Sequence, residues 1–453
     1  MKKLIFLVIS ILFYYCVQEP EGKPVPAIHA FADSMFNISV DSGKIAGASI
    51  LIEHHGEIVL SKSYGFANLE FAVPMPEEAS FEIGSVTKQF TAVAILKLVE
   101  AGKLSLEDDF TKYIDFDTRG KKIKVGQLLN HTSGIPGYTE LPHFWELSVH
   151  TYDRDSLVRF VEQEDFLFEP GEQMIYNNTA YFLLGLIIEK ASEKSYEDYL
   201  KENIVDPLEM KNTYYSSNSK VVKNKAYGYQ FSMNGLLQRP YLDHTWPYAA
   251  GSLSSTARDL LTWLKALHHG EVLHNNFYQQ LITPGTLNDG TPLRYAMGLT
   301  HFDEFGHEVI SHGGGINGFL SETRYYPQDD LYIICLVNTT GPIGAGYFTD
   351  NLVWKLLEKE KLPSVPIDFD LETIDGKYSG QVRGQKITWQ VTTDNDAIIM
   401  HLEEGERPDT IKTYIGNNTW RDGNSILKFG NDELRMDRIS GYYILKKITE
   451  INK

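Results

Sequence analysis

Ser85 and Lys88 are a pair of residues whose types and spacing could do chemistry. They begin an apolar stretch over residues 86–101 that predicts a helix, and positions three apart on a helix share a face. Backbone amides at a helix amino terminus are free to donate, which suits a serine whose attack creates an oxyanion. The lysine could accept the serine proton if its pKa is lowered. The ordinary alternative is a capping serine beside a solvated lysine.

Tyr176 and Asn178 form a second cluster, directly before an apolar stretch at residues 178–191 that predicts another helix. A tyrosine phenol has an ordinary pKa of about 10, but next to an ammonium group it ionises more easily and could act as a general base. The amide of Asn178 offers a donor and an acceptor, which suits a substrate amide. A loop tyrosine followed by an asparagine helix cap is the structural alternative.

The third cluster is the run His312-Gly313-Gly314-Gly315, which precedes strand-like stretches that end near residue 337. Glycines let a backbone approach a ligand closely and aim an amide at it, and His312 could bind a polar end of a substrate. A flexible turn is the alternative. A phosphate cradle is disfavoured, because neither a Walker lysine–hydroxyl pair nor a dinucleotide fingerprint accompanies the glycines.

The elements that would position these clusters can be read from periodicity. Further helices are predicted at residues 195–204 and 256–268, where Ser195 and Thr256 begin Ser/Thr-x-x-acid capping patterns. Near the amino terminus, a His-Gly pair at residues 55–56 separates two strand patterns and predicts a hairpin turn.

Two domains are expected from these patterns. Residues 25–360 mix strands with long helices, which predicts an α/β (α+β) domain. Around residues 359–366 the chain becomes charged and then proline-bearing, which is typical of a linker. Beyond it, residues 387–391 and 398–402 alternate at period two, so residues 370–453 are expected to form a small, separate antiparallel β-domain.

Composition excludes several classes of protein. The chain has 453 residues, 42% of them hydrophobic, so wholesale disorder is excluded. Its formal net charge of −18 argues against binding to nucleic acid or to anionic lipid, which both need a basic face. The only cysteines, Cys16 and Cys335, lie in different regions, so no disulfide framework or thiolate metal cluster is expected. We expect no cofactor and no metal site.

Residues 1–18 indicate where the protein works. Two lysines precede a ten-residue apolar stretch at residues 4–13, which is typical of a secretory signal peptide and too short to span a bilayer. A periplasmic or secreted protein is therefore expected. Cys16 stands where a bacterial lipoprotein carries its lipid, although Tyr14 and Tyr15 are bulkier than the small residues that lipoprotein cleavage usually demands. Such a lipid is the one membrane contact expected.

Together and in this order, the three clusters resemble the motifs of the penicillin-recognising serine hydrolases: class C β-lactamases, D-Ala-D-Ala carboxypeptidases and related esterases. Residues 128–136 also resemble the family's Leu-Leu-x-His-Thr-Ser-Gly segment, residues 249–260 its glycine loop and following helix, and residues 64–67 the end of its opening hairpin. The resemblance covers roughly residues 28–355. It implies a β-lactamase/transpeptidase-like antiparallel sheet with helices on both faces, beside a helical lobe, with the site between them.

The resemblance also implies the catalytic roles. Ser85 matches the family's nucleophile and Lys88 its partner. Tyr176 matches the tyrosine that acts as general base and later as acid. The backbone amides of Ser85 and Gly315 would form the oxyanion hole.

Substrate binding is carried over to Asn178, His312, Gly313 and Gly314. His312 departs from the pattern, because it stands where the best-known relatives have the lysine of a Lys-Thr-Gly triplet. A histidine of ordinary pKa is mostly uncharged at neutral pH, so the fixed cation that would bind a substrate carboxylate is missing. Hydrolysis of an ester or a modified peptide is therefore more expected than efficient β-lactam hydrolysis.

The predicted function is an extracytoplasmic serine hydrolase that cleaves an ester or amide through an acyl-enzyme on Ser85. The substrate would be a small molecule or peptide: a D-amino-acid peptide, including one derived from peptidoglycan, an ester or a β-lactam-like compound. The alternative is a catalytically silent, penicillin-binding-protein-like chain that recognises peptidoglycan or a partner. A binding module has no reason to keep Ser85, Lys88 and Tyr176 together, which favours the enzyme. The natural substrate, the oligomeric state and the role of the tail stay open.

Overall fold

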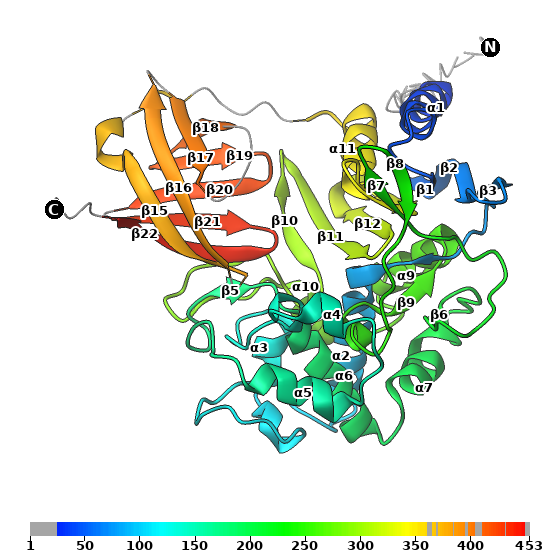
Figure 1. Ribbon diagram of the computed structural model, residues 1–453, viewed down its shortest axis with the longest axis horizontal. Coiled ribbons are helices and arrows are strands. Elements are labelled where there is room, and N and C mark those ends of the chain that lie inside the picture. Colours follow the sequence, from blue (N-terminus) through cyan, green and yellow to red (C-terminus); the bar gives the residue numbers. More distant parts are fainter. Residues whose placement is uncertain are drawn as a thin grey trace, which may run out of the picture.

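The computed structural model describes residues 25–359, 365–367, 370–383, 385–394, 397–403, 410–430 and 432–448. These residues form a mixed α/β body and a β-domain beside it (Figure 1). The expected signal peptide and Cys16 lie outside the described residues. Among the helices that are described, none is both long and apolar enough to cross a bilayer.

The body is organised around an antiparallel sheet whose central strands are covered on both faces. β1 ends at His54 and β2 begins at Glu57, which confirms the predicted hairpin turn. The strands, in spatial order, are β10 (Thr300–Glu304), β11 (His307–Ile316), β12 (Phe319–Tyr326), β13 (Leu331–Val337), β1 (Gly47–His54), β2 (Glu57–Asn68) and β3 (Val73–Pro74).

Alternation along β1 assigns its side chains to two different cores. Ile50 and Ile52 pack under α1 (Val25–Asp41) and α11 (Ala345–Leu356). Leu51 points to the opposite face and joins the larger core of the helical lobe. Every residue of β13 and nearly all of β1 are buried, so β13 is a continuous apolar run, whereas β1 also buries the polar residues Ser49 and Glu53.

The helical lobe lies beside one end of the sheet (Figure 1). Two short three-stranded sheets brace its connections: β4 (Phe81–Glu82), β9 (Leu253–Ser255) and β6 (Tyr214–Tyr215) form one, and β14 (Thr339–Thr340), β7 (Tyr229–Ser232) and β8 (Gly235–Gln238) form the other. The further helices are α2 (Thr87–Glu100), α3 (Val125–Leu129), α4 (Phe144–Leu147), α5 (Arg154–Glu162), α6 (Asn178–Ser192), α7 (Tyr196–Leu200), α8 (Tyr248–Gly251), α9 (Ala257–His268) and α10 (Asn275–Ile282).

The C-terminal strands form their own sheet around their own core, which includes Tyr378, Trp389 and Trp420. The first and last strands pair with each other, so the sheet closes on itself. Its strands are β15 (Gly376–Val382), β16 (Gln385–Asp394), β17 (Ala397–Leu402), β18 (Thr410–Gly416), β19 (Thr419–Asp422), β20 (Ser425–Gly430), β21 (Glu433–Arg438) and β22 (Gly441–Ile448).

The fold class expected from the sequence is confirmed, but the C-terminal domain is also joined to the body. β22 pairs with β5 (Met174–Ile175), a short strand of the helical lobe. Arg294 adds side-chain bonds to Asp437 and to the backbone of the same domain. The segment directly before Tyr176 is therefore held by the C-terminal domain.

Candidate active site

Ser85 lies in a single turn of 3₁₀ helix, Gly84–Val86, that leads directly into α2. Gly84 has a φ of +49°, and a Cβ there would lie 2.9 Å from backbone atoms of Gly315. Only glycine fits both the backbone conformation and the close approach. The turn thereby brings the half-buried Ser85 against β11, the strand that carries Gly315, the other predicted oxyanion donor.

Lys88, on the first turn of α2, is fully buried. Its Nζ donates to Ser85 Oγ at 3.1 Å, to Asn178 Oδ1 at 2.8 Å and to the Ala250 carbonyl at 2.8 Å. Burial, and secondarily the Arg383 guanidinium, lowers the pKa of Lys88 well below its ordinary value of 10.5. A neutral amine in hydrogen-bond contact with a serine hydroxyl can take its proton.

Tyr176 follows β5, and its backbone amide donates to the Ser440 carbonyl of the C-terminal domain at 3.1 Å. Its ring centroid lies 4.8 Å from Lys88 Nζ. Burial raises the pKa of Tyr176 above its ordinary value of 10, while Ser85 and Arg383 act in the opposite direction. Its buried hydroxyl finds no hydrogen-bond partner among the described residues. A buried hydroxyl of this kind is poised to bond to a group that enters the cleft.

Asn178 begins α6, but the capping residue is its neighbour Asn177, whose side chain accepts from the Ala180 amide. Asn178 is therefore free for the site. Its Oδ1 accepts from Lys88, and its Nδ2 donates to Thr139 Oγ1 at 3.3 Å. The structure thus brings Asn178 together with the catalytic candidates, and its first observed role is to fix the lysine.

His312 is buried on β11, and both ring nitrogens are engaged. Because the Gly313 carbonyl can only accept, Nδ1 donates to it at 2.6 Å, and Nε2 accepts from the Tyr295 hydroxyl at 2.9 Å. Burial, followed by the proximity of Lys88, lowers the pKa of His312 to about 3. The ring is therefore neutral at physiological pH and supplies no cation.

The glycines after His312 shape the edge of β11. β10 pairs with β11 only as far as Ser311, so residues 312–316 extend beyond that ladder into the site. A Cβ on Gly314 would lie 2.1 Å from the Ile83 carbonyl, which explains the glycine as a contact with the loop before Ser85. Gly313 and Gly315 line the same cavity as Ser85.

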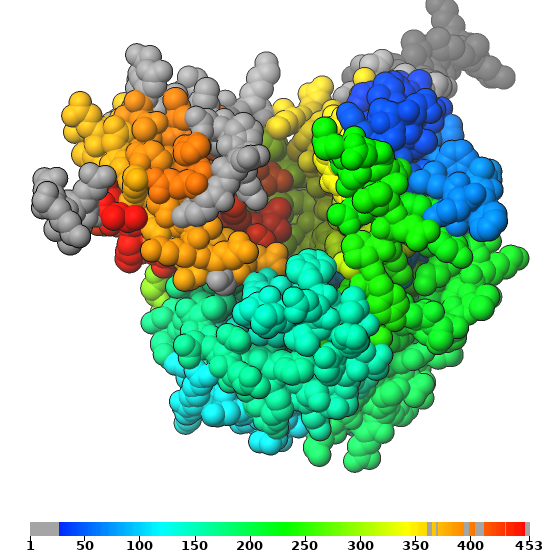
Figure 2. All heavy atoms as spheres, viewed as in Figure 1, coloured from blue at the N-terminus to red at the C-terminus, as the bar shows by residue number. Residues whose placement is uncertain are grey.

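Two cavities meet at Ser85, in the hollow between the C-terminal domain and the body (Figure 2). One, of about 230 Å³, has an aromatic wall that includes Phe144, Trp145 and Trp246. The other, of about 430 Å³, is lined mostly by residues with polar side chains, including His312, and by the β11 glycines. The pair of cavities offers room on both sides of a bond held at Ser85.

Sequence reasoning missed three residues of this cleft: Tyr295, which holds His312, and Ser440 and Arg383, which come from the C-terminal domain. No motif marks them, because their places depend on how distant segments dock. Within the described part of the chain, no group of three or more His, Cys, Asp or Glu side chains is placed to hold a metal ion.

A family model described as Beta-lactamase matches residues 32–357, which include every predicted site residue. The chain belongs to the β-lactamase family. The resemblance inferred from its motifs is thereby confirmed.

Two relatives show which proteins the chain is similar to. The chain is 28% identical to Protein flp of Staphylococcus aureus strain MRSA252 over 68% of this chain and 62% of that protein. The chain therefore spans about three fifths of the length of that relative. It is 28% identical to Penicillin-binding protein 4* of Bacillus subtilis over 78% of this chain and 83% of that protein.

Solved structures agree with the family assignment. The octameric penicillin-binding protein homologue from Pyrococcus abyssi superposes with a TM-score of 0.65 at 27% identity, covering 92% of this chain and all of that one. A D-stereospecific amidohydrolase from Streptomyces superposes with a TM-score of 0.62 at 25% identity, covering 73% of this chain and 98% of that one.

Proposed function

We propose that the chain is a serine hydrolase that cleaves an ester or amide through an acyl-enzyme on Ser85. The observation that carries the proposal is the contact between Ser85 Oγ and the buried Nζ of Lys88 at 3.1 Å. No carboxylate lies within ion-pair distance of that lysine among the described residues, so its amine has no fixed counter-charge to keep it protonated. Family membership supports the same reading.

In the proposed acylation, Ser85 Oγ attacks the substrate carbonyl while its proton passes to the neutral Lys88 amine. The carbonyl oxygen becomes an oxyanion that the amides of Ser85 and Gly315 would stabilise. The tetrahedral intermediate then expels the leaving group, which takes a proton from the Tyr176 phenol, and that phenol is reprotonated from Lys88. Water would hydrolyse the acyl-enzyme by the reverse sequence of transfers.

The sequence assigned the base role to Tyr176, and that assignment stays a prediction. Its burial disfavours the phenolate at rest, whereas burial favours the neutral form of Lys88. The two residues are therefore proposed to act as one unit, with the lysine accepting first and the tyrosine delivering the proton to the leaving group.

The residues that line the cavities at Ser85 indicate which substrates the site would accept. The aromatic wall formed by Phe144, Trp145 and Trp246 suits an apolar acyl group. The position of His312 itself offers no cation for a β-lactam carboxylate, which supports the expectation that β-lactams are poorer substrates than esters or peptide-like amides unless another residue binds that group. An extracytoplasmic location is proposed from the amino-terminal sequence, and fractionation of the producing cells would test it.

A fluorophosphonate probe with peptide mass spectrometry tests the proposal. We expect covalent labelling of Ser85, and we expect Ser85→Ala to lose both the label and turnover of p-nitrophenyl esters by several orders of magnitude. Ser219→Ala, at an exposed serine, is the matched control and should keep both. A folded wild-type protein that takes up no label on Ser85 and turns over no ester, D-peptide or nitrocefin would favour the catalytically silent alternative.

A further inference from the structure

Arg383 reaches the active-site cleft from the C-terminal domain. It occupies the turn between β15 and β16, where Val382 pairs with Gln385 across a two-residue connection. Its φ of +50° is left-handed, a conformation that costs a non-glycine residue about 1 kcal/mol or more. A tight hairpin turn would normally favour Asn or Gly at such a position. The left-handed arginine therefore marks a position at which to look for a functional role.

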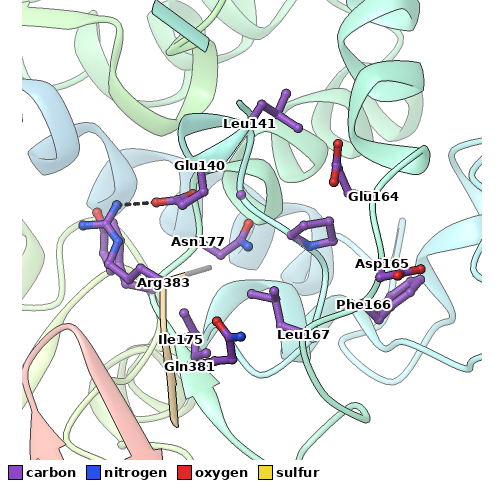
Figure 3. A pocket seen from close by; sticks show the side chains of 13 residues that line it. Glu140, Leu141, Glu164, Asp165, Phe166, Leu167, Ile175, Asn177, Gln381 and Arg383 are labelled. Atoms are coloured by element: carbon purple, nitrogen blue, oxygen red, sulfur yellow. Dashed lines mark hydrogen bonds and ion pairs between the residues drawn. The ribbon is translucent and has the colours of Figure 1, made fainter. Parts of the chain in front are cut away.

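A continuous hydrogen-bond chain connects this arginine with the catalytic lysine. Arg383 Nη2 donates to Glu140 Oε1 at 2.9 Å, as Figure 3 shows, and Thr139 Oγ1 donates to Glu140 Oε2 at 2.9 Å. Asn178 bonds to Thr139, and Lys88 bonds to Asn178. The guanidinium is thus positioned relative to Ser85 by side chains, although it belongs to another domain.

Arg383 lines both cavities that meet at Ser85, and in the aromatic one it is the sole Lys, Arg, His, Asp or Glu among the described lining residues. Its ion-pair partner, Glu140, lines neither of these cavities. Glu140 lines instead a third cavity of about 350 Å³, shown in Figure 3, which Arg383 also lines. The guanidinium therefore borders the substrate space, whereas its carboxylate partner does not.

The other basic groups of the cleft are either deeply buried or paired with carboxylates. Burial lowers the pKa of both Lys88 and His312, which disfavours their charged forms. Arg324, on β12, contacts three carboxylates, those of Glu304, Glu322 and Asp350.

Arg383, by contrast, has a single carboxylate partner among the described residues, and its Nε finds no hydrogen-bond acceptor there. Its side chain is 42% exposed, so a ligand in the cleft can reach it. The guanidinium has five donors in a planar fork that matches the two oxygens of a carboxylate, and Glu140 takes only part of that capacity.

We propose that Arg383 is the specificity-determining residue of this site and binds a carboxylate of the substrate in the polar cavity beside Ser85. It would supply from the C-terminal domain the positive charge that related enzymes carry at the position of His312. The inference rests on the proposed function and narrows its substrates to esters or amides that bear a free carboxylate, as the C-terminal residue of a peptide does.

The test compares matched substrates: an acyl-glycine thioester whose thioglycolate leaving group carries a carboxylate, and the methyl ester of the same compound. In Arg383→Gln, the ratio of kcat/KM for acid over methyl ester should fall about 10- to 100-fold, the range of a charge-assisted contact. Arg383→Lys should restore part of that ratio. Glu140→Gln should raise the ratio, because it removes the competing carboxylate.

Lys428→Gln is the matched control, since it removes one exposed cation from the same domain on a strand away from the cleft lining. It should leave the ratio and both rates unchanged. An unchanged ratio in Arg383→Gln, including an equal loss on both substrates, would overturn the inference.

A binding measurement separates this inference from the hydrolase proposal. In the Ser85→Ala background, calorimetry with N-acetyl-D-alanyl-D-alanine and its C-terminal amide needs no turnover. Adding Arg383→Gln should weaken binding of the acid at least tenfold more than binding of the amide. Equal weakening of acid and amide would refute the role of Arg383. Wild-type protein that binds the acid selectively but never reacts at Ser85 would refute only the hydrolase proposal.

Discussion

Lys88→Met is expected to lower the activity of this site strongly while changing the stability of the fold only slightly. Methionine fills a similar volume without a polar terminus, so the packing of α2 is kept. The change removes the acceptor for the Ser85 proton, and proton transfer by a positioned side chain is worth roughly 10²- to 10⁴-fold in rate. We expect kcat/KM for an ester to fall about a thousandfold or more.

The effect of the same change on stability is the difference of two opposing contributions. The Asn178 and Ala250 oxygens lose their donor, which costs about 1–3 kcal/mol each. Against this, the folded protein no longer buries an amine that water would solvate and protonate, a relief of several kcal/mol. The free energy of unfolding should therefore change by no more than about 2 kcal/mol, in either direction.

A double-mutant cycle with Tyr176→Phe completes the test, because that change removes only a hydroxyl without a described partner. Each single variant should lose nearly as much activity as the double variant, since both residues serve one proton transfer. Lys97→Met, on the same helix, is the control and should keep full activity. Esterase kinetics together with thermal melts provide both readouts. A double variant whose loss equals the product of the single losses would refute the shared proton pathway.

Two further predictions concern the whole chain. Removal of residues 366–453 should lower kcat/KM for an ester at least a hundredfold, because Tyr176 loses its backbone partner and the cleft loses Arg383. Circular dichroism would show that the fragment is still folded. A fully active fragment would contradict the docking of the C-terminal domain against the site. Burial lowers the pKa of both His268 and His312 from the ordinary value of 6.5 to about 3 in the folded protein. Between these two pH values the unfolded chain therefore binds more protons than the folded chain, and the free energy of unfolding should fall as the pH drops from 6.5 towards 3. His268→Phe should flatten that fall in melting temperature between pH 6.5 and pH 4, and an unchanged slope would count against it.

Local patterns were sufficient to predict the helix that follows Ser85 and the contact of Ser85 with Lys88. Ser85 and Lys88 lie three positions apart at the start of a strongly apolar stretch, and both their spacing and their shared face follow from helix geometry. The hairpin turn at residues 55–56 was predictable for a similar reason, because strand alternation breaks at a His-Gly pair. These features depend on residues that are close in sequence.

The charge distribution of the cleft was not predictable in the same way. His312 could be identified as a departure from the family, but its neutrality depends on burial and on the proximity of Lys88, which comes from a separate segment. Arg383 and Glu140 meet only because two domains dock, and no period or motif connects positions so far apart. Long-range contacts of this kind carry no local signal in a single sequence.

The pairing of β5 with β22 has a consequence for how the protein is made. A chain emerges from the ribosome with its amino terminus first, and its domains fold in that order. Met174 and Ile175 are synthesised well before the strand that they join, Gly441–Ile448. Ser85 and Lys88 can thus be in place long before Tyr176 is anchored. Biosynthesis itself would delay the proposed activity until β22 has been made.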